Sequence, residues 1–122
     1  MNLKCQHVVF SMSDKKAMKG FYIDILGLDL LEDEEHFFAA QAGIVRFSFF
    51  EGAKKYPINE DATGISIVLR CDDIGKTRKE LVNKSINLLS DITEAPGFMK
   101  YITIEDPDNN IVHIAEYLRE PI

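Results

Sequence analysis

A repeated order of secondary-structure patterns is the feature that most constrains how this chain can fold. Each half of the 122-residue sequence begins with an alternating strand pattern, continues with an amphipathic helix, and ends with three more strand patterns. Asp14 and Asp73 stand where each helix begins, and Asp is a favoured capping residue. Leu30 lies sixteen residues after the first cap and Leu89 sixteen after the second, so the halves superimpose at an offset of 59. The order predicts two βαβββ modules in an α+β fold.

Hydrophobic periodicity sets the predicted extent of each element. In the first module the helix runs from its Asp14 cap to about Leu26, and the strands cover residues 3–12, 29–34, 36–42 and 44–50. In the second module the helix ends near Lys84 or Ser85, and the strands cover residues 64–71, 86–90, 100–105 and 111–117.

The modules meet at a change in composition. Residues 53–63 are rich in Lys, Pro, Asn, Glu and Asp and have no periodicity, which predicts a linker between a first module at residues 1–52 and a second at 64–122. The segment Thr93 to Phe98 contains Pro96-Gly97 and is predicted to be a loop long enough to lie over a cleft.

Charge and hydropathy exclude two classes of partner. The net charge is −6 and no stripe of Lys and Arg is present, so we expect no nucleic-acid binding. No apolar run approaches the roughly 18–20 residues that a membrane-spanning helix needs. The first residues lack the charged and then apolar layout of a signal peptide, so we expect a cytoplasmic protein.

The strands are predicted to have one aliphatic or aromatic face and one mixed face. Val8, Phe10, Phe47, Ile104 and Ile114 are typical of the first, which we expect to pack on the helices. The opposite face combines apolar side chains with candidate ligand-binding residues, which are His7, Arg46, Ser48, Ser66, Arg70, Tyr101 and His113. A solvated sheet face has polar residues too, but a mixed lining favours a small-molecule pocket.

Several short segments resemble those of one superfamily. They are Ser13-Asp14, Phe21-Tyr22, Leu26-Gly27-Leu28 and the closing Asp106-Pro107-Asp108-Asn109-Asn110. Together with the paired modules, they make the chain similar to the vicinal oxygen chelate superfamily of glyoxalase I, bleomycin-resistance proteins, fosfomycin-resistance enzymes and extradiol dioxygenases. The resemblance implies a half-open barrel of paired modules, a small-molecule ligand and a homodimer.

The resemblance also implies where metal ligands would lie. In metal-dependent members the ligands come from the first and last strand of each module, in the order His, Glu, His, Glu. Those positions correspond here to His7, to Arg46 or a residue within two of it, to Ser66 and to His113. Arg is a donor only and Ser is a poor ligand, whereas Glu105 or Glu51 could add a carboxylate if the strand register shifts.

Three functions stay open at this stage. The first is a binding protein similar to bleomycin-resistance proteins, with a degenerate metal site and a polar or anionic ligand. The second is a metal-dependent lyase, isomerase or dioxygenase similar to glyoxalase I, in which His7, His113 and a carboxylate hold Zn, Ni, Mn or Fe. The third is a protein-interaction module. No catalytic residue is assigned, and whether the chain is an enzyme stays undecided.

Overall fold

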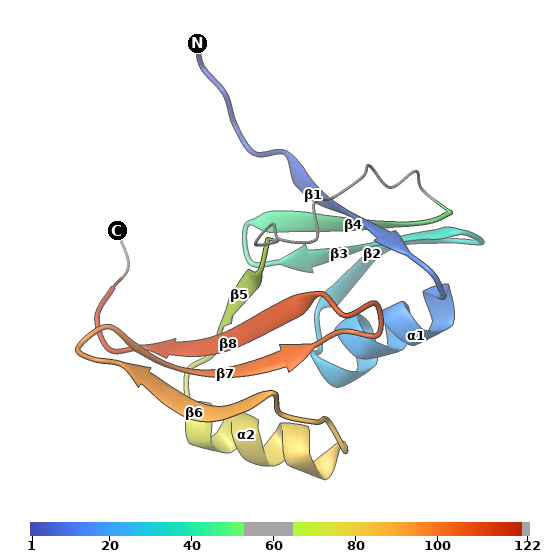
Figure 1. The fold of residues 1–122 in the computed structure, drawn as a ribbon. Coiled ribbons are helices and arrows are strands. Elements are labelled where there is room, and N and C mark those ends of the chain that lie inside the picture. Colours follow the sequence, from blue (N-terminus) through green and yellow to red (C-terminus); the bar gives the residue numbers. More distant parts are fainter. Residues whose placement is uncertain (53–64, 121–122) are drawn as a thin grey trace, which may run out of the picture. The chain divides into compact units, whose positions relative to one another are not determined.

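The computed structural model describes residues 1–52 and 65–120, which form parts of two compact units, Met1–Ala62 and Thr63–Ile122 (Figure 1). The predicted linker at residues 53–63 lies outside the described residues. Each unit has one open four-stranded mixed sheet and helical segments against it, which is the α+β architecture predicted from the sequence.

Unit 1 has the order strand, helix, three strands. Its strands are β1 (His7–Met12), β2 (Asp29–Glu34), β3 (Phe37–Ala42) and β4 (Val45–Glu51), and they lie in the order β1-β4-β3-β2. The first and last strands of the unit, β1 and β4, are parallel neighbours, whereas the other pairs are antiparallel. This pairing places the residues of β1 and β4 side by side at the β1 edge of the sheet.

The helix of unit 1 begins where the sequence predicts and then changes its winding. Asp14 caps α1 (Lys15–Lys19) by accepting a hydrogen bond from the amide of Ala17 at 3.3 Å. The chain continues directly into η1 (Gly20–Ile25), a π-helical segment that the sequence pattern does not predict. The predicted apolar face is confirmed, because Met18, Phe21 and Tyr22 are buried. Figure 1 shows α1 along one face of its sheet, where it contacts β3 and β4.

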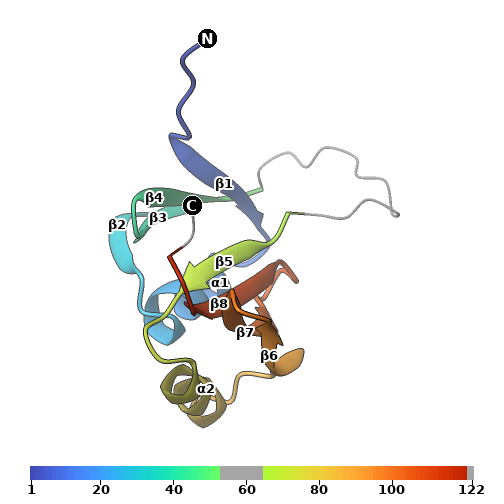
Figure 2. The ribbon, with the colours of Figure 1, turned by 90° about the vertical axis from the view of Figure 1, so that its left-hand side faces the viewer.

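Unit 2 repeats this order and topology. Its elements are β5 (Ile67–Arg70), α2 (Ile74–Asn83), β6 (Ser90–Ala95), β7 (Met99–Glu105) and β8 (Ile111–Tyr117), with strand order β5-β8-β7-β6. Asp73 caps α2 through the amide of Lys76 at 3.0 Å. Figure 2 shows α2 against the sheet that includes β6 and β7.

The position of β6 corrects the prediction for the residues after α2. The strand lies at Ser90–Ala95 and not at residues 86–90, so most of the predicted Thr93–Phe98 loop is strand and tight turn. Pro96 and Gly97 form the turn, with Gly97 at φ +72°, and Phe98 donates to the Ala95 carbonyl at 2.9 Å. A register shift between Ser90 and Thr93 interrupts the strand, and this irregularity hides its alternation in the sequence.

The predicted division between sheet faces is confirmed for the core. Among the side chains predicted to face the helices, those with less than a tenth of their surface exposed are Phe10, Phe47, Phe49, Ile102, Ile104, Val112 and Ile114. The opposite faces keep apolar side chains at the surface, since Val9 is 55%, Phe50 39% and Val68 44% exposed. Within the described residues, no helix is long and apolar enough to cross a membrane.

Candidate functional site

The exposed face of unit 1 has a row of connected polar side chains. His7 and Arg46 are direct partners in the β1–β4 ladder, and Ser48 lies two residues further along β4. The Ser48 hydroxyl meets Nδ1 of His7 at 3.0 Å and accepts from Nε of Arg46 at 3.3 Å. The guanidinium also donates to Glu32 at 3.0 Å. An imidazole, a hydroxyl and a cation are therefore held in one network.

Ser48 is the buried residue that connects this network. It is 1% exposed, so its hydroxyl must find partners within the protein. Because Nδ1 of His7 is bonded to this hydroxyl, Nε2 is the ring nitrogen left for other contacts. His7 itself is exposed, and Arg46 keeps about a third of its side-chain surface.

The exposed face of unit 2 carries the imidazole of His113. Nδ1 of His113 meets the Thr103 hydroxyl at 2.9 Å across the β7–β8 ladder. Tyr101 packs edge-on against the imidazole, with ring centroids 5.7 Å apart. Glu105 lies on the same face, two residues beyond Thr103 along β7. Both units thus hold one histidine through its Nδ1 atom and a hydroxyl from a neighbouring strand.

The strand registers define which residues of the two units correspond. Val9 precedes the Asp14 cap by five residues and pairs with Ser48, while Val68 precedes the Asp73 cap by five residues and pairs with His113. Ser48, and not Arg46, is therefore the counterpart of His113. Arg46 is the residue predicted from the sequence for this position. Arg46 and Ser48 are two residues apart and point to the same face, so alternation alone does not distinguish them.

Ser66 and Arg70 lie at opposite ends of the β5 region. Ser66, the counterpart of His7 at the offset of 59, directly precedes the first residue of the strand and is exposed. Arg70 is the last residue of β5, pairs with Ala115, and places its guanidinium over the Tyr117 ring at 5.4 Å. Glu120 holds this guanidinium with two hydrogen bonds, at 2.8 and 3.1 Å.

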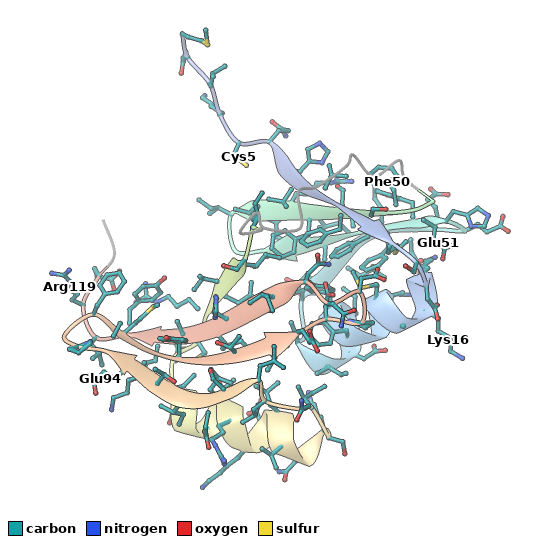
Figure 3. The ribbon with its side chains drawn as sticks, in the orientation of Figure 1. Cys5, Lys16, Phe50, Glu51, Glu94 and Arg119 are labelled. Atoms are coloured by element: carbon teal, nitrogen blue, oxygen red, sulfur yellow. The ribbon has the colours of Figure 1, made fainter. Side chains whose placement is uncertain are left out.

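Glu51 does not face His7 or His113. It pairs with Met12, which is buried on the helix side, and accepts from the backbone amide of Lys15 at 2.8 Å (Figure 3). Its second oxygen lies 3.1 Å from Nδ1 of His36. Two hydrogen bonds lower the pKa of the Glu51 carboxyl. The one from His36 has the larger effect, and the one from the Lys15 amide has the next largest. Glu51 therefore stabilises the start of α1 and is not placed to join His7 in a metal site.

The same arrangement recurs in unit 2, where sequence reasoning also missed it. Glu116 of β8 accepts from the amide of Ile74, the first residue of α2, at 3.0 Å. A glutamate at the end of the last strand thus supports the aspartate cap of the helix in both units. Burial raises the pKa of the neighbouring Cys71 thiol. The signal in the sequence is a Glu within the last two residues of each unit's last strand.

The donor set within each described unit does not complete a metal site. No group of three or more His, Cys, Asp or Glu side chains that could hold a metal ion occurs among residues 1–52 and 65–120. His7 has a hydroxyl and a guanidinium as neighbours, and His113 has a hydroxyl and, on the same face, Glu105. Zn²⁺ in stable sites takes three or four protein ligands, so neither unit alone fits it.

Comparison with known proteins agrees with the repeated fold. Residues 4–114 match the model of the Glyoxalase/Bleomycin resistance protein/Dioxygenase superfamily, and the chain belongs to that family. No curated protein is similar enough in sequence to match the chain.

Solved structures of similar fold include enzymes and proteins of other descriptions. A lactoylglutathione lyase from Agrobacterium tumefaciens is 18% identical with a TM-score of 0.73, and the alignment covers 91% of both chains. A glyoxalase family protein from Enterococcus faecalis is 20% identical with a TM-score of 0.73, covering 93% of this chain and 97% of the other. A virulence protein from Salmonella typhimurium is 22% identical with a TM-score of 0.70, covering 96% and 98%. At these identities the likeness defines the fold alone.

Proposed function

We propose that the chain is a small-molecule-binding protein that takes a polar or anionic ligand on its exposed sheet faces, with a degenerate metal site. The observation that carries this proposal is the neighbourhood of His7. Its imidazole shares the Ser48 hydroxyl with the Arg46 guanidinium, at 3.0 and 3.3 Å. A cation beside a ligand position repels a metal ion and attracts an anion.

The other candidate positions support a bound polar molecule. Ser66, Arg70, Tyr101 and His113 offer a hydroxyl, a guanidinium, a phenol and an imidazole, which are groups that orient a ligand by hydrogen bonds. Val9, Phe50 and Val68 are exposed on the same faces and offer apolar surface for the rest of the ligand. We further propose that the protein is cytoplasmic and forms a homodimer. Light scattering of the purified protein would test the dimer.

A metal-dependent lyase, isomerase or dioxygenase is the second candidate. His113 and Glu105 favour it, because an imidazole and a carboxylate on one sheet face are two ligands of the kind that Zn, Ni, Mn or Fe takes. The resemblance adds His7 as a candidate ligand. When bound, such a metal would act as a Lewis acid on substrate oxygens, whereas Thr103 would fix the ring of His113.

Metal analysis of protein purified without a histidine tag separates the two candidates. For the binding protein we expect no stoichiometric Zn, Ni, Mn or Fe after dialysis, and a ligand-observed NMR screen should give fragment hits that His7→Ala or His113→Ala weakens. Stoichiometric metal that both substitutions remove, together with turnover that a chelator abolishes, would instead support the enzyme. Fragment hits that neither substitution affects would contradict both.

A further inference from the structure

Arg70 has a fixed carboxylate partner on the exposed face of unit 2. Both terminal nitrogens of its guanidinium donate to Glu120, at 2.8 and 3.1 Å, in the paired geometry that Arg uses to recognise carboxylates. Glu120 lies in the segment after β8 and not in the sheet. The hydrogen bonds between the two groups are the main cause of two pKa shifts. They lower the pKa of the Glu120 carboxyl and raise the pKa of the Arg70 guanidinium.

The guanidinium is oriented independently of Glu120. Arg70 lies over the ring of Tyr117 at 5.4 Å, and Tyr117 packs edge-on against Phe98 at 5.6 Å. The guanidinium carbon of Arg119 lies 5.2 Å from the centroid of the Phe98 ring (Figure 3). Stacking on an aromatic face leaves the hydrogen-bonding edge of a guanidinium free to meet an anion. Arg70 is therefore prepared for a carboxylate, whichever molecule supplies it.

The contact from Glu120 is easily displaced. The side chains of Arg70 and Glu120 are 49% and 80% exposed, and exposed ion pairs contribute little to stability. The last strand ends at Tyr117, and the amide of Leu118 still donates to the Phe98 carbonyl at 2.8 Å. Glu120 lies two residues beyond that hydrogen bond. A short segment thus carries a carboxylate to Arg70 at high local concentration but holds it weakly.

We infer that Arg70 is a binding site for a ligand carboxylate, and that Glu120 is an intramolecular competitor that the ligand displaces. The inference rests on the proposed function, since it assigns a substrate class to the same face. Arg70 pairs with Ala115, which pairs with Tyr101, and Val68 of the adjacent row pairs with His113. The rows are about 7 Å apart along the strands. A ligand whose carboxylate meets Arg70 and whose flat body lies over Tyr101 would therefore reach toward the imidazole, on the side of Arg70 away from Tyr117.

Benzoate is a suitable probe, because it combines a carboxylate with a flat ring. We would titrate it into the ¹⁵N-labelled full chain and follow amide shifts by NMR, with benzamide as the uncharged control. Binding should shift residues around Arg70 and Tyr117, and Arg70→Met, which keeps the length of the side chain without its charge, should abolish those shifts. Glu120→Gln should tighten benzoate binding about two- to fivefold, because it removes a weak competitor.

Glu94→Gln is the matched control for the loss of one negative charge. Glu94 is exposed and pairs with Lys100, so it faces away from the Tyr101 and His113 side of the sheet (Figure 3). If it tightens binding as much as Glu120→Gln does, net charge and not competition is the cause, and the inference is wrong. Equal binding of benzamide, or unchanged binding in Arg70→Met, also overturns it.

The outcomes separate this inference from the proposed function. Fragments that depend on His113 without a benzoate response at Arg70 would overturn the inference alone. Benzoate binding at Arg70 that Glu120→Gln tightens, together with no ligand sensitive to His7→Ala or His113→Ala, would contradict the proposed function but retain the carboxylate site. Dispersed amide spectra of every variant establish that each one is folded.

Discussion

Individual hydroxyl groups set the orientation of His7 and His113. Ser48 is shared between His7 and Arg46, whereas Thr103 serves His113. Neither histidine therefore needs a metal to hold its ring in place. Each hydroxyl occupies Nδ1, so Nε2 is the ring nitrogen that remains for a ligand.

Removing the Ser48 hydroxyl should release the ring of His7. Ser48→Ala leaves two donors or acceptors without their partner, and we expect the free energy of unfolding to fall by about 0.5–1.5 kcal/mol. The tautomer preference of His7, measured from its ring ¹⁵N shifts, should also weaken, whereas that of His113 should not. Thr103→Val is the reciprocal control. A fixed His7 tautomer in Ser48→Ala would contradict the assigned role.

The turn before β8 depends on one buried carboxylate. Asp106 is 2% exposed and accepts from the amides of Asp108 and Asn110 and from the side chain of Asn110, at 2.8–2.9 Å. Asn109 between them has φ +66°, in the left-handed region. The Asp-Pro-Asp-Asn-Asn sequence thus encodes the turn that places His113.

Substitutions at Asn109 should follow backbone preference. Asn109→Gly should leave stability unchanged or slightly raised, because Gly adopts positive φ without strain. Asn109→Val should lower the free energy of unfolding by about 1–2 kcal/mol, since a branched side chain is disfavoured there. Chemical denaturation measures both. Equal stability of the two variants would show that the backbone at this position relaxes.

At the scale of elements, the sequence predicts regular segments and misses irregular ones. Strand β8 has the predicted bounds, and the faces that bury Phe10 and Ile104 were readable from alternation. The displaced β6 was not, because its register shift breaks the alternation. The π-helical turn of η1 keeps an amphipathic pattern that an α-helix shares. Local spacing specifies which face a residue takes but not these irregularities.

The candidate site was predictable in part for the same reason. Alternation put His7, Arg46, Ser48 and His113 on exposed faces, as the ladders have them. The hydrogen bond between His7 and Ser48 joins residues 41 positions apart, and no local pattern encodes it. The role of Glu51 at the start of α1 was hidden likewise, because it depends on where β4 ends relative to the helix.

An ion pair connects helix α2 to β6, and its contribution to stability depends on pH. Arg78 contacts both oxygens of Asp91, at 2.6 and 2.9 Å. This contact, followed by the amide of Ile92, lowers the pKa of Asp91 from 3.8 to about 2. A carboxyl whose pKa is lower in the folded state stabilises the fold when ionised. Its contribution is therefore complete above about pH 4 and is lost between pH 4 and 2.

Asp91→Asn should therefore be destabilising only where the carboxylate is ionised. At pH 6 we expect Tm to fall by about 1–3 °C, a small effect because the pair is exposed. The difference from the unsubstituted protein should shrink as pH falls toward 2. Glu94→Gln on the same strand is the control for charge. Calorimetry at several pH values measures both, and a difference that persists at pH 2 would refute this role.

Across the whole molecule, the two faces of each sheet have separate roles. The helix-facing sides hold a mainly aromatic core in unit 1 and an aliphatic core of Ile102, Ile104, Val112 and Ile114 in unit 2. The opposite sides hold every histidine and arginine that we assign to ligand binding.

Phe49 and Phe50 test that division, because they are adjacent residues on opposite faces of β4. Phe49 is fully buried, with its ring centroid 4.6 Å from that of Phe10, 4.9 Å from Tyr22 and 4.2 Å from Phe38. Phe49→Ala should lower the free energy of unfolding by about 3–5 kcal/mol, because it removes a large ring from a packed cluster.

Phe50→Ala should have the converse effect. Phe50 is 39% exposed, so truncation should cost only about 1 kcal/mol, while weakening the binding of any fragment that His7→Ala also weakens. Urea denaturation followed by circular dichroism measures the stability of both variants, and NMR titration measures fragment binding. If Phe50→Ala were as destabilising as Phe49→Ala and left binding unchanged, the exposed face would be part of the structural core, and a ligand surface there would be ruled out.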